Sequence, residues 1–209
     1  MLAFFLTGVL GVVFSKMLDD WSRQRQVEAT VRERAVESLR EITDLLYERR
    51  TRSELVASSI RRDAGEAEVR ARKSAYDDAY IRWNTKLQSN LFRIREMTSG
   101  AVTIGGYSRF EFYAERYLVP LLLAADACIT SAYDTYLTPA NGSLDSARKK
   151  LDTCSMRGAQ VYIRDIHRST VTCSYAFTDA LFMTVRAAST RREKEEDLSM
   201  ELERRCRVP

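Results

Sequence analysis

The first fifteen residues of the chain, MLAFFLTGVLGVVFS, contain no charged side chain. Lys16 follows them, and two more apolar residues, Met17 and Leu18, come next. At about 1.5 Å per residue, eighteen helical residues span roughly 27 Å, close to the ~30 Å hydrocarbon core of a bilayer. The pattern therefore predicts a transmembrane anchor over residues 1–18, with Lys16 and Trp21 at the membrane interface.

Two other interpretations of this segment remain open. A secretory signal peptide would begin with a basic region and end in a small-residue cleavage site, and the segment shows neither. A buried helix of a protein core is the second alternative, because the segment is short for a membrane span. The basic residues nearest the segment all follow it: Lys16, Arg23 and Arg25. The positive-inside rule then predicts a single-pass protein of the inner (cytoplasmic) membrane, with its N-terminus outside and its soluble domain in the cytoplasm.

Small side chains recur every four residues within the anchor, at Ala3, Thr7, Gly11 and Ser15. A four-residue step places them on one face of a helix, and such faces let transmembrane helices approach closely. We therefore expect this face to mediate self-association and the protein to be a homo-oligomer.

Apolar residues continue at three- and four-residue steps through residues 19–97, a stretch without proline and with Gly65 as its single glycine. This spacing predicts a long amphipathic helical region that resembles a coiled coil. Two places are candidate breaks. Thr51-x-x-Glu54 fits a capping box, and the run from Asp63 to Glu66 contains the glycine.

Residues 98–107 (TSGAVTIGGY) have the glycine content of a loop, and residues 108–190 are expected to form the core helices. Pro120 predicts a kink or a break at Val119, and a last long helix is expected from Leu144. Residues 191–209 are mostly charged and are expected to form an exposed extension. The sequence thus predicts an all-α fold: a single N-terminal transmembrane helix followed by a long antiparallel bundle of three to five helices.

The charge pattern narrows the range of partners. The 209 residues include 33 basic and 29 acidic side chains, for a net charge of +4. Basic and acidic residues alternate along the helices instead of forming a one-signed stripe, so no nucleic-acid partner is expected. Membrane lipid and further copies of the chain are the expected partners. Tyr76, Tyr80 and Trp83 could form a face for a protein partner, although aromatic packing in the core is favoured.

Candidate chemistry is sparse. Four cysteines lie far apart and the chain has one histidine, His167, so no metal site or cofactor is predicted, and the cysteines are expected to be reduced. Asp126 and Asp134 lie in an apolar stretch, where a carboxylate usually pairs with an arginine or a tyrosine hydroxyl. His167 is expected to be an ordinary surface or interhelical residue. No catalytic motif is present, so the protein is not expected to be an enzyme.

These features favour a membrane-anchored cytoplasmic scaffold or interaction protein. Two alternatives belong to other classes. One is a membrane-active effector whose anchors assemble and perturb the bilayer, and the other is a helical enzyme that holds a metal through acidic residues.

Overall fold

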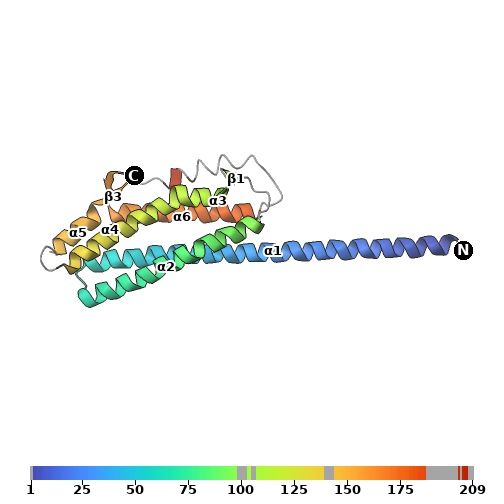
Figure 1. Ribbon diagram of the computed structural model, residues 1–209, viewed down its shortest axis with the longest axis horizontal. Coiled ribbons are helices and arrows are strands. Elements are labelled where there is room, and N and C mark those ends of the chain that lie inside the picture. Colours follow the sequence, from blue (N-terminus) through green and yellow to red (C-terminus); the bar gives the residue numbers. More distant parts are fainter. Residues whose placement is uncertain are drawn as a thin grey trace.

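The computed structural model describes residues 2–97, 103–104, 107–138, 144–186, 202 and 204–206. Within these ranges, the side chains of residues 2–13, 94–97, 103–104, 107–110 and 184–186 are not described. The fold is mostly helical, as the sequence predicts, and its longest helix projects beyond the others (Figure 1).

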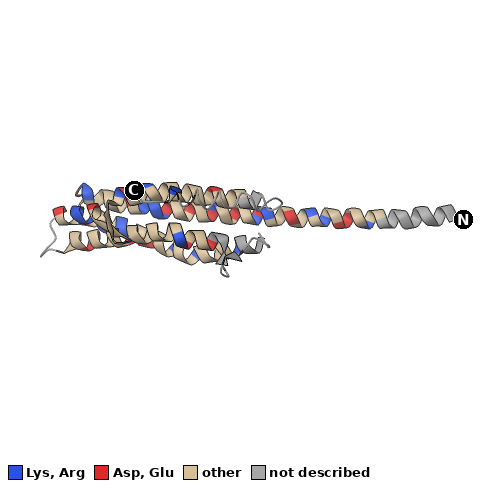
Figure 2. Ribbon diagram, turned by 90° about the horizontal axis from the view of Figure 1, so that it is seen from above, with Lys and Arg blue, Asp and Glu red and all other residues tan. Residues whose placement is uncertain are grey.

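Helix α1 (Leu2–Arg61) runs without interruption for 60 residues, or about 90 Å. Its described side chains from Phe14 to Thr30 are all exposed, and regular burial begins only at Ala35. Acidic and basic residues mix along the projecting part (Figure 2). The predicted break at Thr51 is wrong, because α1 continues through it with Ser53 and Val56 buried against the other helices.

A tight turn joins α1 to α2 (Glu66–Met97), which packs back along it (Figure 1). Asp63 and Gly65 have positive φ angles of 55° and 84°. Glycine adopts this left-handed region without a Cβ penalty, and the turn donates the Ala64 N–H to the Ser59 carbonyl at 3.0 Å. The break predicted between Asp63 and Glu66 is therefore confirmed.

A short hairpin of β1 (Thr103–Ile104) and β2 (Tyr107–Ser108) leads into α3 (Arg109–Tyr113). A π-helical turn, η1 (Ala114–Leu118), then precedes α4 (Val119–Leu137). Pro120 lies in the first turn of α4, where its missing N–H leaves no hydrogen bond unmade. The predicted break at Val119 is wrong, because α3, η1 and α4 follow one another without interruption and Leu118 and Val119 both have right-handed helical backbone angles.

The segment from Leu144 was expected to be one long helix, and that prediction is wrong. It comprises α5 (Leu144–Asp152), the antiparallel strands β3 (Cys154–Met156) and β4 (Ala159–Val161), and α6 (Ile163–Arg186). Arg157 and Gly158 form the two-residue turn, with φ angles of 50° and 84°. Positive φ at both positions is what a tight hairpin with the right twist requires.

All four cysteines form disulfide bonds, which corrects the expectation that they are reduced. Cys128 of α4 is bonded to Cys154 of β3, and Cys173 of α6 to Cys206. Each pair is separated by 26 or 33 residues in the sequence, so spacing along the chain gave no sign of the pairing. The fold brings each pair of Cα atoms to 5.1 or 4.4 Å, within the range that a disulfide spans.

The hydrophobic core consists of two clusters along the bundle. One lies where α1, α2, η1 and α6 meet and includes Ile42, Trp83, Leu118 and Phe177. The other lies nearer the turn between α1 and α2 and includes Val56, Ile60, Ile129 and Ile166.

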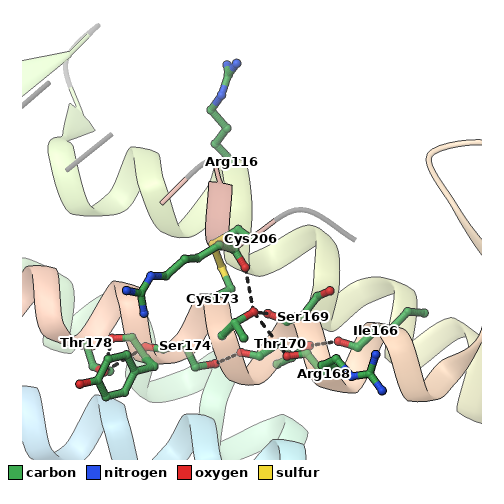
Figure 3. The surroundings of a disulfide bond; sticks show 12 residues. Arg116, Ile166, Arg168, Ser169, Thr170, Cys173, Ser174, Thr178 and Cys206 are labelled. Atoms are coloured by element: carbon green, nitrogen blue, oxygen red, sulfur yellow. Dashed lines mark hydrogen bonds between the residues drawn. A yellow bond between two sulfur atoms is a disulfide. The ribbon is translucent and has the colours of Figure 1, made fainter. Parts of the chain in front are cut away.

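Residues 191–209 were expected to be exposed; of those that the structure describes, Arg204 and Arg205 are exposed, whereas Leu202 and Cys206 are not. Leu202 and Cys206 are buried in the first cluster. The Cys173–Cys206 bond joins this part of the chain to α6 (Figure 3). The neighbouring residues Thr172 and Arg205 also interact, because the Thr172 hydroxyl donates to the Arg205 carbonyl at 2.8 Å. Leu202 thus packs on the core, and Cys206 is bonded to α6.

The proposed partner face is also corrected by burial. Tyr76 and Trp83 are almost wholly enclosed in the bundle, because their step of seven residues places both on the α2 face that packs against its neighbours. Tyr80 alone of the three is exposed. Core packing, the alternative for this aromatic set, applies to Tyr76 and Trp83.

Within the residues that the structure describes, no helix is both long and apolar enough to cross a membrane. At Ala3, Thr7 and Gly11 the structure describes the helix but not the side chains, so self-association through the small-residue face stays a prediction. Lys16 and Trp21 are exposed, and the Arg25 guanidinium lies 3.6 Å from the centroid of the Trp21 ring.

Candidate functional site: an arginine-lined cavity between α1 and α6

A cavity of about 490 Å³ lies between α1 and α6. Its size falls within the range of small-molecule sites in proteins. Residues of the second half of α1 and the first half of α6 form its walls. From α1 come Arg50, Glu54, Ala57, Ser58 and Arg61, from the turn after it Arg62, and from α6 Arg164, His167, Arg168 and Val171.

Helical periodicity explains how these residues meet. Positions 50, 54, 57 and 61 of α1 follow three- and four-residue steps, and so do positions 164, 168 and 171 of α6. The adjacent face of each helix carries apolar residues that are buried in the core, including Val56, Ile60 and Ile166. The cavity therefore lies along the seam where two amphipathic helices leave the core.

The wall of the cavity is strongly basic. Five of its side chains are arginines, and Glu54 is its single carboxylate. Arg50 and Glu54 pair at 2.8 Å. The other arginines pair with carboxylates outside the lining: Arg61 with Asp152 at 3.3 Å, Arg62 with Glu68, and Arg164 and Arg168 with Asp165 at 3.8 Å each.

His167 forms the inner wall. Of the two positions expected for it, at the surface or between helices, the structure shows the second. It is buried, and its Nε2 lies 2.7 Å from Ser53 Oγ. Burial lowers the pKa of His167 to about 4, and the charges of Arg50 and Arg61 act in the same direction. The imidazole is therefore neutral at physiological pH.

A second polar layer lies behind this wall. The carboxylate of Asp126 accepts hydrogen bonds from Arg49 Nη2 and from the Tyr76 hydroxyl. The Arg49 guanidinium also lies 4.8 Å from the ring centroid of Tyr80 and 6.0 Å from that of Trp83. The expected pairing of Asp126 with arginine and tyrosine is confirmed, whereas Asp134 is exposed on α4.

Burial dominates the electrostatics of this inner pair. It raises the pKa of Asp126 and lowers the pKa of Arg49, while their mutual attraction opposes both shifts. A void of about 10 Å³ is lined by residues of both layers, among them Arg50, His167, Arg49 and Asp126. That volume is roughly the space of one water molecule.

The arrangement suits binding better than catalysis. A serine hydroxyl beside an imidazole is the pair used in nucleophilic catalysis, but an imidazole with a pKa of about 4 is a weak base at neutral pH. Among the described residues, no three histidine, cysteine or acidic side chains gather as a metal site requires. The excess of guanidinium groups makes the cavity attractive to anions.

The sequence analysis identified Asp126, Tyr76 and His167 but missed Arg49, Ser53 and the arginines of the cavity. Arginine is frequent along the whole chain, so no local pattern distinguishes the five that converge here. Their spacing on α1 and α6 was visible, but the pairing of these two helices, more than a hundred residues apart, was not.

Comparison with known proteins places the chain in no described group: no family model, curated protein or solved structure matches it.

Proposed function

We propose that the protein is a membrane-anchored helical scaffold or interaction protein, in which α1 serves as both the anchor and a member of the bundle. One observation carries the proposal. Helix α1 continues from the apolar N-terminal segment into the bundle without a break, and nearly all of its described side chains from residue 14 to residue 34 are exposed.

The exposed apolar residues near the N-terminus support a membrane location. Phe14, Met17 and Leu18 are 65%, 67% and 58% exposed. These three side chains follow the uncharged segment, and the described part of the chain leaves more than half of each exposed. A lipid surface would cover them, with Trp21 and Arg25 at the level of the headgroups.

The rest of the projecting helix supports the role of a spacer. A helix that is polar on all sides is typical of a solvent-exposed connection between two anchored parts. From Leu18 to Ala35 the helix rises about 25 Å, which would hold the bundle clear of the headgroups. A bundle held at a distance in this way presents its faces to partners and not to lipid.

The two disulfides lead us to revise the expected orientation. Disulfides persist in oxidising compartments, whereas cytosolic thiols are kept reduced. Both bonds join separate elements of the bundle, one across α4 and β3 and one between α6 and the chain end. We therefore place the bundle on the non-cytoplasmic side of the membrane and the N-terminus in the cytoplasm, opposite to the orientation that the basic residues favour.

Fractionation of cells that express the full-length chain tests the anchor. We expect the chain to remain with membranes at high pH and to be released by detergent. Leu10→Arg should shift the chain to the soluble fraction, because a charged side chain at the centre of a membrane helix costs about 3 kcal/mol. Gln26→Arg, a matched change in the exposed part of α1, should leave it with the membrane. Release of the unmodified chain by high pH alone would contradict the proposal.

A further inference from the structure

We propose that the cavity between α1 and α6 binds a small polyanion, a soluble molecule that carries two or more phosphate or carboxylate groups. This binding site goes beyond the scaffold role and does not depend on it.

The first argument is the charge of the lining. Five arginines line the wall and His167 there is neutral, while the carboxylates that pair with these arginines are four: Glu54 in the lining and Glu68, Asp152 and Asp165 beside it. One positive charge is in excess, and a polyanion would replace carboxylates that lie outside the lining. Arginine also matches the flat, two-oxygen geometry of phosphate and carboxylate through paired N–H donors.

The second argument is the distribution of the arginines. Arg50 lies eleven residues before Arg61 on α1, which separates their backbones by about 16 Å. Arg164 and Arg168 add guanidinium groups from the facing helix, one turn apart. A single inorganic phosphate is too small to contact both ends of such a row, whereas a molecule with several anionic groups spans it.

The third argument is the character of the cavity between those ends. Ala57 and Val171 line it with apolar surface, and His167 contributes an uncharged imidazole. Arg50 is the least exposed of the five arginines, with 24% of its side chain accessible. A ligand that reaches Arg50 therefore leaves most of its water behind, which strengthens a charged contact there.

The position of the cavity favours a soluble ligand over the headgroups of the membrane that would hold α1. The cavity begins at Arg50, and Arg50 lies 32 residues beyond Leu18, or roughly 48 Å along the helix. It lies in the half of α1 that is remote from the N-terminus (Figure 1). Lipid phosphates at the base of the projecting helix lie far from it.

The inner wall gives the site an internal reporter. Arg50 and Arg61 lower the pKa of His167 in addition to its burial. A bound polyanion would offset their charges and raise that pKa. Because the chain contains one histidine, its imidazole resonances identify this residue without ambiguity.

The test uses the full chain in a nonionic detergent, with tripolyphosphate, citrate and inorganic phosphate as probes. Calorimetry should show that tripolyphosphate or citrate binds at least tenfold more tightly than inorganic phosphate. NMR titration should show a higher His167 pKa in the presence of the tighter probe. Binding of tripolyphosphate alone would identify phosphate groups as the ligand chemistry, and binding of citrate alone would identify carboxylates.

Substitutions locate the site. Arg61→Gln and Arg164→Gln should each weaken binding of the tighter probe about tenfold. Arg70→Gln is the matched control, because Arg70 pairs with Glu66 on α2 and neither residue lines the cavity. Thermal unfolding checks that each variant is folded, and Arg168→Gln replaces any that is not. Equal binding by the control and the cavity variants, or no binding of either polyanion at millimolar concentration, would overturn the proposal.

Discussion

Ser53 Oγ and His167 Nε2 lie 2.7 Å apart in the interior of the bundle, and this contact joins α1 to α6 across 114 residues of sequence. The imidazole in this pair is neutral, because burial and two nearby arginines oppose its protonation. His167 lines both the arginine-lined cavity and the small void that Arg49, Asp126 and Tyr76 also line.

We predict that the stability of the bundle falls as the pH decreases from about 6.5 to about 4. The pKa of His167 is about 4 in the folded chain, against 6.5 for an ordinary histidine, so the unfolded chain takes up the proton first. The loss should approach 3 kcal/mol. Facing groups are Arg50, Glu54 and Arg61 on α1, with Arg164, Asp165 and Arg168 on α6.

Urea unfolding at a series of pH values measures this dependence. His167→Gln should flatten the curve over the same interval and leave any contribution of the carboxylates. A His167 pKa near 6.5 in the folded chain, measured by NMR, would contradict the prediction.

The Asp126 substitution tests the inner layer. Asp126→Ala leaves the Arg49 guanidinium buried without its partner carboxylate, and we expect the free energy of unfolding to fall by about 3 kcal/mol. Asp134→Ala, on the exposed side of the same helix, should change it by less than about 0.5 kcal/mol. Urea unfolding of both variants gives the comparison. Similar losses for the two would show that Asp126 and Arg49 do not form a buried pair.

Reduction should loosen the end of the chain. Leu202 and Cys206 pack on α6 through the Cys173–Cys206 bond (Figure 3). Replacing both cysteines of this pair with alanine should allow a protease to remove the residues after α6 rapidly, with a loss of about 3 kcal/mol in stability. The same replacement at Cys128 and Cys154 should also destabilise the chain but leave its end protected. Equal protease resistance of the two variants would contradict this assignment.

The small-residue face of the anchor is expected to hold two copies of the chain together. We expect Gly11→Leu to reduce cross-linked oligomers in membranes, because a large side chain prevents close approach of two helices. Val12→Leu, one residue away and off the small-residue face, should leave cross-linking unchanged. The amount of cross-linked dimer on a denaturing gel measures the difference, and an unchanged yield for Gly11→Leu would remove this face as the contact.

The helical fold could be predicted because local signals agree with it. Apolar periodicity identified α1 and α2, Gly65 marked the turn between them, and Pro120 marked the start of α4. The β3–β4 hairpin was missed because its strands are three residues each and one glycine, Gly158, carries the turn. The capping pattern at Thr51 was misleading, since tertiary packing on both sides keeps α1 helical there.

The candidate site was less predictable than the fold. Asp126 was identified because a carboxylate in an apolar helix requires a partner. Its partner Arg49, the Ser53–His167 contact and the convergence of the arginines all depend on which helices pack together. Both disulfides depend on the same information, since neither pair is close in sequence.

The central claim is a helical bundle that an N-terminal anchor holds on the non-cytoplasmic side of a membrane. Protease added to sealed right-side-out vesicles from expressing cells, followed by mass spectrometry, tests it most directly. We predict that the bundle is digested, that its peptides carry the Cys128–Cys154 and Cys173–Cys206 links, and that the N-terminal segment is retained in the membrane. An intact bundle that becomes accessible only after the vesicles are opened, with four free thiols, would contradict the account.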